Sequence, residues 1–218
     1  MKHQPDPATL LEYASGTLST PFSILVSAHI ETCHESKQIV KVGEEIGGNY
    51  IDNIEPNEEQ TIDYSAFLKK LDSNELKNTN KKHKYNYDLK SVIPSVLQPY
   101  IGQNFNNIDW SFLAFGIKKY QVNIDNDPSN SLTLLKIKPK KKIPAHGHTG
   151  REMTLVLQGS FDDEHGSYAA GDIAEHDGVE THQPIVSSDE DCICIISTEG
   201  PLIFDNYLAN KLQSLIRI

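Results

Sequence analysis

The sequence contains no long hydrophobic run. None of its stretches approaches the roughly 20 consecutive apolar residues that a membrane-spanning helix needs. The opening residues, MKHQPDPATLLEYASG, lack the apolar core of a secretion signal. Cysteine is scarce, at three in 218 residues, and this odd, low number argues against a disulfide framework and for a reducing compartment. We therefore expect a cytoplasmic protein without a membrane anchor.

Positive charge is also in deficit. Lys and Arg together number 20 against 30 Asp and Glu, which gives a formal net charge of −10 at pH 7. Binding to nucleic acid phosphates needs an excess of basic side chains, so we do not expect this chain to contact nucleic acid directly. A basic protein is the partner that an acidic chain fits best.

The first part of the chain has the spacing of amphipathic helices. Apolar residues recur every three or four positions in a first helix near Leu10, and then over 21–33, 36–50 and 62–76. Pro21 suits the first turn of the second helix. These helices carry more apolar surface than a small bundle has to bury. The surplus either receives a partner helix or packs against the second half of the chain.

From about residue 92 the pattern becomes that of β-strands. Strand-like segments are expected over 131–138, 152–161, 171–175 and 191–197, with turn signals between them. Many short strands at this spacing predict a sandwich or barrel of the jelly-roll kind. Polar stretches at 52–61 and 77–88 are predicted to be linkers, and residues 206–218 again have helical spacing.

The stretch HGHTGRE at residues 146–152 has the pattern of a metal site. His146 and His148 are two residues apart, so on a strand both side chains point to the same side. Glu152 opens the next predicted strand, and His182 follows thirty residues later, after a glycine turn. Three imidazoles and one carboxylate suit Zn²⁺, Fe²⁺, Mn²⁺ or Ni²⁺. The alternative is that these are surface histidines in loops.

This stretch resembles the cupin superfamily. His146, His148, Glu152 and Gly159 match the second half of the first cupin motif, and His182 is placed in a second motif whose proline and spacing differ here. The resemblance implies a cupin barrel, which is a double-stranded β-helix. The metal in such a barrel is either catalytic, as in the many cupins that are dioxygenases or isomerases, or it serves structure or sensing.

A second candidate metal cluster lies in the helical part. His29 and Cys33 are four residues apart, which places an imidazole and a thiol on one face of a helix. This pattern resembles the zinc-binding anti-sigma fold, in which a second cysteine and an earlier histidine complete the site. His3 is placed for the earlier ligand, but Ser36 stands where the family has the second cysteine.

The consequence of Ser36 is open from the sequence alone. A serine hydroxyl is a poor Zn²⁺ ligand, because a thiolate is the species that binds tightly. His34, Glu35 or a water molecule would have to complete the tetrahedron, or the site is weak or empty. The remaining alternative is that Cys33 is a core cysteine and His29 a histidine with satisfied hydrogen bonds.

The two halves together resemble the ChrR-type anti-sigma factors over nearly the whole chain. The segments LLEYASGTLS, HGHTGREMTLVLQGSFDDE, GDIAEHD and DCICI carry this likeness. It implies that the N-terminal helices clamp an extracytoplasmic-function-type sigma factor and hide the surfaces with which it binds RNA polymerase. It also implies that the cupin domain responds to a stress signal, singlet oxygen or organic peroxides.

Patterns and resemblance together predict an α+β multidomain protein. We expect a small N-terminal helical bundle over 1–76, a flexible linker over 77–91 and a C-terminal cupin domain over 92–218. The implied zinc ligands are His146, His148, Glu152 and His182 in the cupin, and His3, His29 and Cys33 in the helical domain. The resemblance implies no catalytic residue.

Cys192 and Cys194 form a third feature. They lie two residues apart on a predicted strand and so face the same side. They are either oxidation targets near the cupin metal or two small buried hydrophobic residues.

Two other functions fit parts of the sequence. One is a metal-dependent cupin dioxygenase with a helical accessory domain, and the other is a small-molecule-binding cupin with no sigma factor as partner. Three histidines and one glutamate close a four-coordinate zinc site, whereas iron would keep two positions free for a substrate. The anti-sigma function, without enzymatic activity, accounts for both halves and is the one predicted. The connector 77–88 is then a candidate hinge or cleavage point for release.

Overall fold

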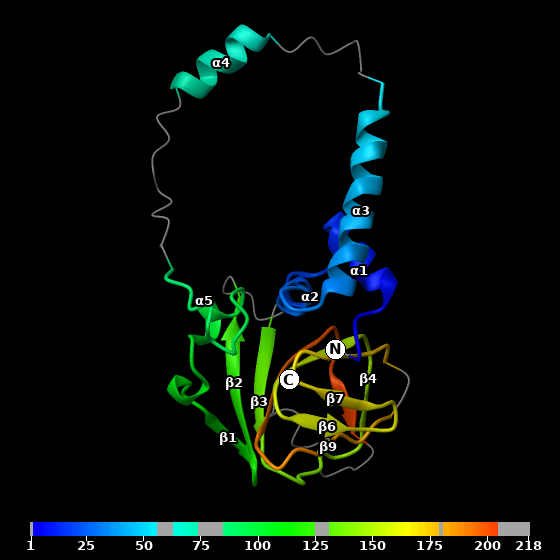
Figure 1. The fold of residues 1–218 in the computed structure, drawn as a ribbon, viewed down its shortest axis with the longest axis vertical. Helices are drawn as coiled ribbons and strands as arrows, with labels where there is room; N and C mark the ends of the chain where they lie inside the picture. The colour runs from blue at the N-terminus through cyan, green and yellow to red at the C-terminus, as the bar shows by residue number, and fades with distance from the viewer. Residues whose placement is uncertain (1, 56–62, 74–84, 125–130, 179–180, 205–218) are drawn as a thin grey trace.

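The computed structural model describes residues 2–55, 63–73, 85–124, 131–178 and 181–204. Helices come first along the chain and strands follow (Figure 1). The helices are α1 (Pro7–Ser15), α2 (Thr20–Ile30), α3 (His34–Asp52), α4 (Tyr64–Ser73) and α5 (Gln98–Ile101). The predicted helices therefore form within a few residues of their expected bounds, while the helix expected over 206–218 lies outside the described residues.

The second half consists of antiparallel strands in three sheets. The strands are β1 (Ser111–Ala114), β2 (Ile117–Asn123), β3 (Ser131–Ile137), β4 (His146–His148), β5 (Glu152–Gln158), β6 (Ser160–Asp162), β7 (Ser167–Ala169), β8 (Ile173–His176), β9 (Ile185–Val186), β10 (Cys192–Thr198) and β11 (Leu202–Phe204). The largest sheet has the order β1-β2-β3-β10-β5-β8, and the smaller sheets are β7-β6-β9 and β11-β4. Strands that are distant in sequence, such as β3 and β10, are therefore neighbours, as in the predicted jelly-roll barrel.

Gly159 moves the chain from one sheet to another. The single strand expected over 152–161 is in fact two strands, since β5 pairs with β8 and β10 while β6 pairs with β7 and β9. Gly159 between them has φ +73°, and a Cβ there would lie 2.7 Å from Ser188 Oγ. Glycine is the residue that adopts this left-handed conformation without a steric penalty. The corner of the barrel therefore depends on it.

Two hydrophobic clusters fill the two faces of the large sheet. One lies between the helices and the sheet and includes Leu10, Phe22, Leu25, Met153, Leu155 and Ile195. The other lies between the sheets and includes Leu135, Ile137, Val156, Phe161, Val186 and Cys194. Because both faces of β5 are covered, its sequence EMTLVLQ lacks the polar alternation of a half-exposed strand.

α3 packs tightly on α1 at its beginning and leaves the molecule at its end. At Gly43 a Cβ would lie 2.9 Å from Ala14 Cβ, so the absence of a side chain permits the close approach of the two helices. Farther along, Ile46 is 62% exposed and Tyr50 is 73% exposed. Phe67 on α4 is also exposed, and α4 stands apart from the rest of the protein in Figure 1. The surplus apolar surface on these helices is thus left open.

Residues 85–91 are held in place against α5. Tyr85 donates a hydrogen bond to the Gln98 carbonyl oxygen at 2.6 Å, and the Asp88 amide donates to Gln98 Oε1 at 2.9 Å. The rest of the predicted linker, residues 77–84, lies outside the described residues. The division of the chain at residues 76 and 92 stays a prediction.

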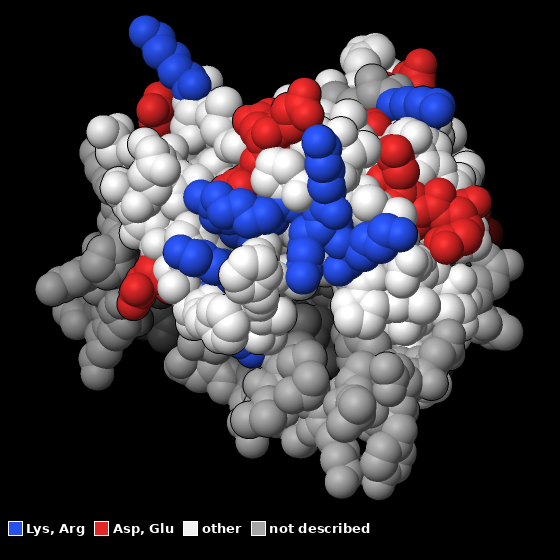
Figure 2. All heavy atoms as spheres, turned by 90° about the horizontal axis from the view of Figure 1, so that it is seen from below, with Lys and Arg blue, Asp and Glu red and all other residues white. Residues whose placement is uncertain are grey.

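Charge is distributed unevenly over the molecule. Figure 2, seen from below, shows lysines gathered at the end of the barrel away from α1 and α3. They include Lys118, Lys136, Lys138, Lys140 and Lys141. Residues 1–55, in contrast, hold eight acidic and three basic side chains. Within the part of the chain that the structure describes, no helix combines the length and apolar character needed to cross a membrane.

Candidate metal centre

The three segments that carry the predicted cupin ligands meet inside the barrel. His146 and His148 point inward from β4, and Glu152 is the first residue of β5. The backbone of His182 exchanges two hydrogen bonds with that of His146, at 3.1 and 3.0 Å. All four side chains are buried, and one potential ligand atom from each lies within 4.8 Å of the others. The structure therefore brings together the four residues that the sequence pattern selected.

The histidine nitrogens converge on one point. His182 Nε2 lies 3.2 Å from His146 Nε2 and 3.2 Å from His148 Nε2. Glu152 Oε1 lies 3.9 Å from His182 Nε2, and its Oε2 lies 3.3 Å from His148 Nδ1. Three imidazoles and one carboxylate from three separate segments are thus aimed at a shared volume.

The hydrogen bonds on the far side of two rings fix where their protons are. His146 Nδ1 donates to the Pro144 carbonyl oxygen at 2.9 Å, and His182 Nδ1 donates to Asp163 Oδ2 at 3.1 Å, because these oxygens only accept. In the neutral rings both Nε2 atoms then carry lone pairs, which face each other. A cation between them removes this repulsion, so the residues fit a bound metal ion.

Burial sets the charge of His146, His148 and Glu152. It lowers the pKa of His146 to about 4 and that of His148 to about 3, and nearby histidines add to both shifts. Burial also raises the pKa of Glu152 to about 7. Neutral imidazoles are the form that binds metal ions, and a buried carboxylate beside them is stabilised by a positive ion.

Two further side chains belong to this centre that the sequence patterns did not select. Asp163 Oδ2 accepts from His182 Nδ1 and lies 3.6 Å from Nε2 of His176, which β8 brings next to Glu152. His176 is buried, and among the described residues its Nε2 has no hydrogen-bond partner. Both residues sit in the conspicuous segments DDEHG and GDIAEHD, but no spacing rule linked them to the ligands.

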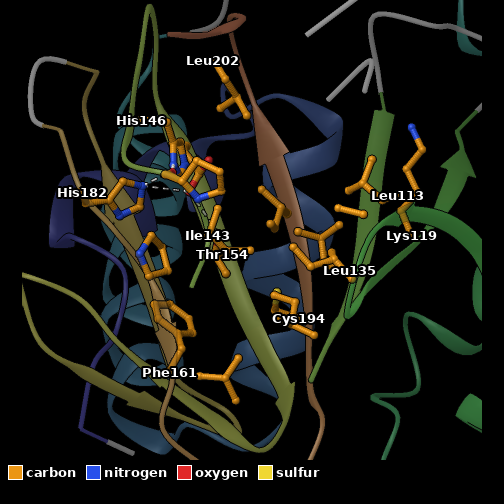
Figure 3. A pocket seen from close by; sticks show the side chains of 18 of the residues that line it. Leu113, Lys119, Leu135, Ile143, His146, Thr154, Phe161, His182, Cys194 and Leu202 are labelled. Carbon is orange, nitrogen blue, oxygen red and sulfur yellow. Dashed lines mark hydrogen bonds and ion pairs between the residues drawn. The ribbon is translucent and has the colours of Figure 1, made fainter. Parts of the chain in front are cut away.

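A cavity of about 440 Å³ opens beside three of the four side chains, those of His146, Glu152 and His182 (Figure 3). His146 and His182 lie at one side of it, and Leu113 and Leu135 lie across from them. Most of the other lining residues are apolar: Ile117, Ile137, Ile143, Phe161, Ala174 and Val186. The barrel can therefore admit a mostly apolar small molecule up to the histidines.

Cys194 also lines this cavity, and Cys192 is buried on the same strand. The hydrogen bond that the Cys194 thiol donates to Cys192 raises the pKa of Cys194 well above its usual range, and burial adds to the shift. The thiol is therefore protonated, which is the less reactive form.

The second predicted cluster is arranged differently. His3 packs its ring on Tyr168 of the barrel, with 4.5 Å between ring centroids. His29 and Cys33 instead surround the Ser36 hydroxyl, at 3.0 and 3.3 Å. Within the described ranges, no group of three potential metal ligands contains any of these residues. The structure does not bring His3 to His29 and Cys33.

The helices contact the barrel through residues that adjoin the metal centre. Arg151, which precedes Glu152, donates to Glu12 Oε2 on α1 at 2.7 Å. Glu175, which precedes His176, accepts from the Thr9 hydroxyl at 2.6 Å. Since neighbouring strand residues face opposite sides, each pair joins the inside of the barrel to the helical half.

The fold and the site define a protein class: a cupin barrel with a buried group of potential metal ligands and a helical domain packed on its sheet. A family model described as the ChrR cupin-like domain matches residues 99–202. This matched segment contains all four predicted cupin ligands.

The likeness extends to the helices. The anti-sigma-E factor ChrR of Cereibacter sphaeroides is 30% identical over 218 residues, covering 100% of this chain and 99% of that protein. A crystal structure of Rhodobacter sphaeroides SigE in complex with the anti-sigma ChrR matches with a TM-score of 0.74 and 28% identity, over 90% of this chain and 98% of that one. The chain belongs to the ChrR family of anti-sigma factors. It is a regulatory protein rather than an enzyme.

Proposed function

We propose that this chain captures an extracytoplasmic-function-type sigma factor with its N-terminal helices, and that a metal-holding cupin domain controls its release. The similar solved protein is an anti-sigma factor bound to SigE. In this chain, the observation that carries the proposal is the exposed apolar face of α3 and α4, which includes Ile46 and Tyr50. Such a face on an amphipathic helix is a typical site for a partner helix. The proposal places the protein in the cytoplasm, where a sigma factor meets RNA polymerase.

The acidic charge of the N-terminal region also supports sigma-factor binding by the helices. The eight acidic side chains of residues 1–55 outnumber the three basic ones. A DNA-binding partner is basic, and opposite charges speed association and favour the correct partner. We assign sigma-factor binding to residues 1–76, the linker to 77–91 and sensing to the cupin domain at 92–218.

We propose zinc as the ion at the cupin centre, held by His146, His148, Glu152 and His182. Iron, manganese and nickel accept the same donors, but four protein ligands complete the tetrahedron that zinc prefers and leave it no open position. Such an ion neutralises the buried carboxylate and links three segments of the barrel. A closed site suits a sensor better than a catalyst.

The proposed signal is oxidative: singlet oxygen or an organic peroxide. A peroxide with an apolar body fits the cavity of about 440 Å³, whose wall contains the histidine cluster. The proposed targets of singlet oxygen are the imidazole rings of this cluster. The buried and protonated Cys194 thiol is a slower nucleophile, so we rank Cys192 and Cys194 after the histidine centre as sites of oxidation.

The proposed route from the barrel to the helices runs through two pairs of adjacent residues. A shift of Glu152 moves Arg151, which binds Glu12 on α1. A shift of His176 moves Glu175, which binds Thr9 at the start of the same helix. Since α1 packs on α3, a change at the metal centre alters the face that binds the sigma factor.

The test is binding of the full-length chain to the sigma factor encoded beside it. We expect Ile46→Asp to weaken binding by roughly 30-fold or more, the loss of about 2 kcal/mol that defines a hot spot. Phe115→Asp is the matched control, because Phe115 is also highly exposed, but at the far end of the barrel. Equal binding by the Ile46→Asp and wild-type chains in calorimetry would exclude the α3 face as the contact.

A further inference from the structure

Three side chains contact the buried Ser36 hydroxyl at the place where the helical domain of this family would hold its zinc. The Ser36 hydroxyl, at the start of α3, donates to Gln4 Oε1 at 2.9 Å. It also lies 3.0 Å from His29 Nε2 and 3.3 Å from Cys33 Sγ. His29 and Ser36 have no exposed surface, and Cys33 is also buried. Because His29 Nδ1 donates to the Gly171 carbonyl oxygen, Nε2 of the neutral ring carries a lone pair, and this lone pair and Gln4 Oε1 share the single Ser36 proton. The Ser36 oxygen can accept a hydrogen bond from the Cys33 thiol.

These side chains do not fit a zinc ion. A structural zinc site needs four nitrogen, sulfur or carboxylate ligands around one point. His29 and Cys33 supply two, whereas the hydroxyl of Ser36 and the amide of Gln4 are poor ligands. His29 offers only Nε2, because its Nδ1 donates to the Gly171 carbonyl oxygen at 2.8 Å. Two of the four positions of a zinc tetrahedron would therefore fall to Ser36 and Gln4, which bind each other rather than a metal.

The other candidates for the missing positions lie elsewhere. The ring of His3 rests on Tyr168, across the contact with the barrel. His34 and Glu35 are exposed on α3, and His34 contacts Gln38 on the same helix. The sequence offered His3, His34 and Glu35 as ligands that could complete the site. Among the described residues, none of them forms a potential metal-binding group with His29 and Cys33.

We infer that the helical domain of this chain has exchanged a zinc ion for a metal-free junction centred on the Ser36 hydroxyl. The junction connects the N-terminal segment through Gln4, the end of α2 through His29, and the start of α3 through Cys33 and Ser36. The contact between His29 and Gly171 ties this junction to the barrel. Metal binding by the whole chain then belongs to the cupin centre alone. A chelator then acts on the sigma-binding helices only through the barrel.

Cobalt separates the two sites, because a thiolate ligand gives Co²⁺ a charge-transfer absorption that nitrogen and oxygen ligands do not give. The cupin ligands contain no sulfur. The full-length wild-type chain, loaded with Co²⁺, is expected to bind one ion per chain without this absorption. A thiolate band that disappears in Cys33→Ala would overturn the inference.

A gain-of-function variant completes the test. Gln4→His combined with Ser36→Cys supplies four zinc ligands at the junction, together with His29 and Cys33. This variant is expected to bind one additional Co²⁺ ion per chain and to acquire the thiolate band. If it fails to fold, the wild-type spectrum alone still decides. A wild-type chain that binds no Co²⁺ would contradict the proposed cupin metal, while the metal-free junction would stand, so the two failures are distinguishable.

Discussion

Asp163 shows how a single residue outside the proposed ligand set can control the proposed metal centre. Its carboxylate accepts the Nδ1 proton of His182, and this contact directs the Nε2 lone pair of His182 toward the other histidines. Side chains that orient metal ligands in this way contribute strongly to affinity, because they fix both the tautomer and the position of the ring. Asp163 therefore acts as a positioning residue.

We expect Asp163→Asn to weaken metal binding by roughly 10- to 100-fold, the usual effect of losing such a contact. Affinity is measured by competition with a coloured chelator. Asp162→Asn is the matched control, since Asp162 is an exposed neighbour that binds only the Ser187 hydroxyl in the described structure. Equal affinities for the two variants would show that His182 does not depend on Asp163 for its orientation.

At the scale of elements, the barrel is defined by where a strand leaves one sheet for another. β5 and β6 are separated only by Gly159, and they pair with different neighbours. A side chain at Gly159 would both require the left-handed conformation and approach the Asp191 carbonyl oxygen at 3.0 Å. The corner thus positions β5, which carries Glu152, relative to the turn that carries Asp163.

We expect Gly159→Ala to destabilise the protein by at least about 1–2 kcal/mol, the cost of the left-handed conformation for an L-residue. Gly48→Ala on α3 is the matched control, because a Cβ there meets nothing within 4 Å. Alanine in a helix is favoured over glycine by about 0.5–1 kcal/mol, so this control is expected to be neutral or stabilising. Urea unfolding monitored by circular dichroism measures both. A Gly159→Ala protein as stable as the wild type would show that the corner can form without glycine.

At the scale of the whole molecule, the helices and the barrel are joined by contacts that adjoin the metal centre. Arg151 pairs with Glu12 on α1 and with Glu199 on the loop after β10, and its guanidinium lies over the Phe22 ring. The hydrophobic cluster between α2 and the sheet continues this contact. A rigid joint of this kind can carry a change in the barrel to the helices as a coupling free energy.

We expect Arg151→Gln to uncouple the two halves. In the wild type, the metal-loaded and metal-free proteins should differ in sigma-factor affinity by about 5-fold or more, which is the lower end of the usual range of coupling effects. In Arg151→Gln the ratio of the two affinities should move toward one, since the link between Glu152 and α1 is lost. Calorimetric titrations of metal-loaded and chelator-treated protein give the ratio. Lys138→Gln, which removes an ion pair with Asp191 at the far end, is expected to leave it unchanged. An unchanged ratio in Arg151→Gln would place the coupling elsewhere.

The sequence by itself determined the features that depend on neighbouring positions in the chain. Helical spacing predicted α2 and α3, and alternation and turn residues predicted the strands. His146, His148, Glu152 and His182 were selectable because three of them fall within seven residues and a known motif supplies the fourth. The apolar surplus of the helices was also evident, although its exposure was not.

Only the tertiary structure decided which distant residues meet. Asp163 and His176 join the metal centre because strand pairing brings β8 beside β5 and turns the chain at Gly159. Gln4, not His3, reaches the Ser36 hydroxyl, since the N-terminal segment is docked on the barrel through Asp172 and the ring of His3 is held by Tyr168. Local spacing specifies an element and its buried face. The register between elements follows from packing the whole chain at once, and this register selects the side chains that face each other.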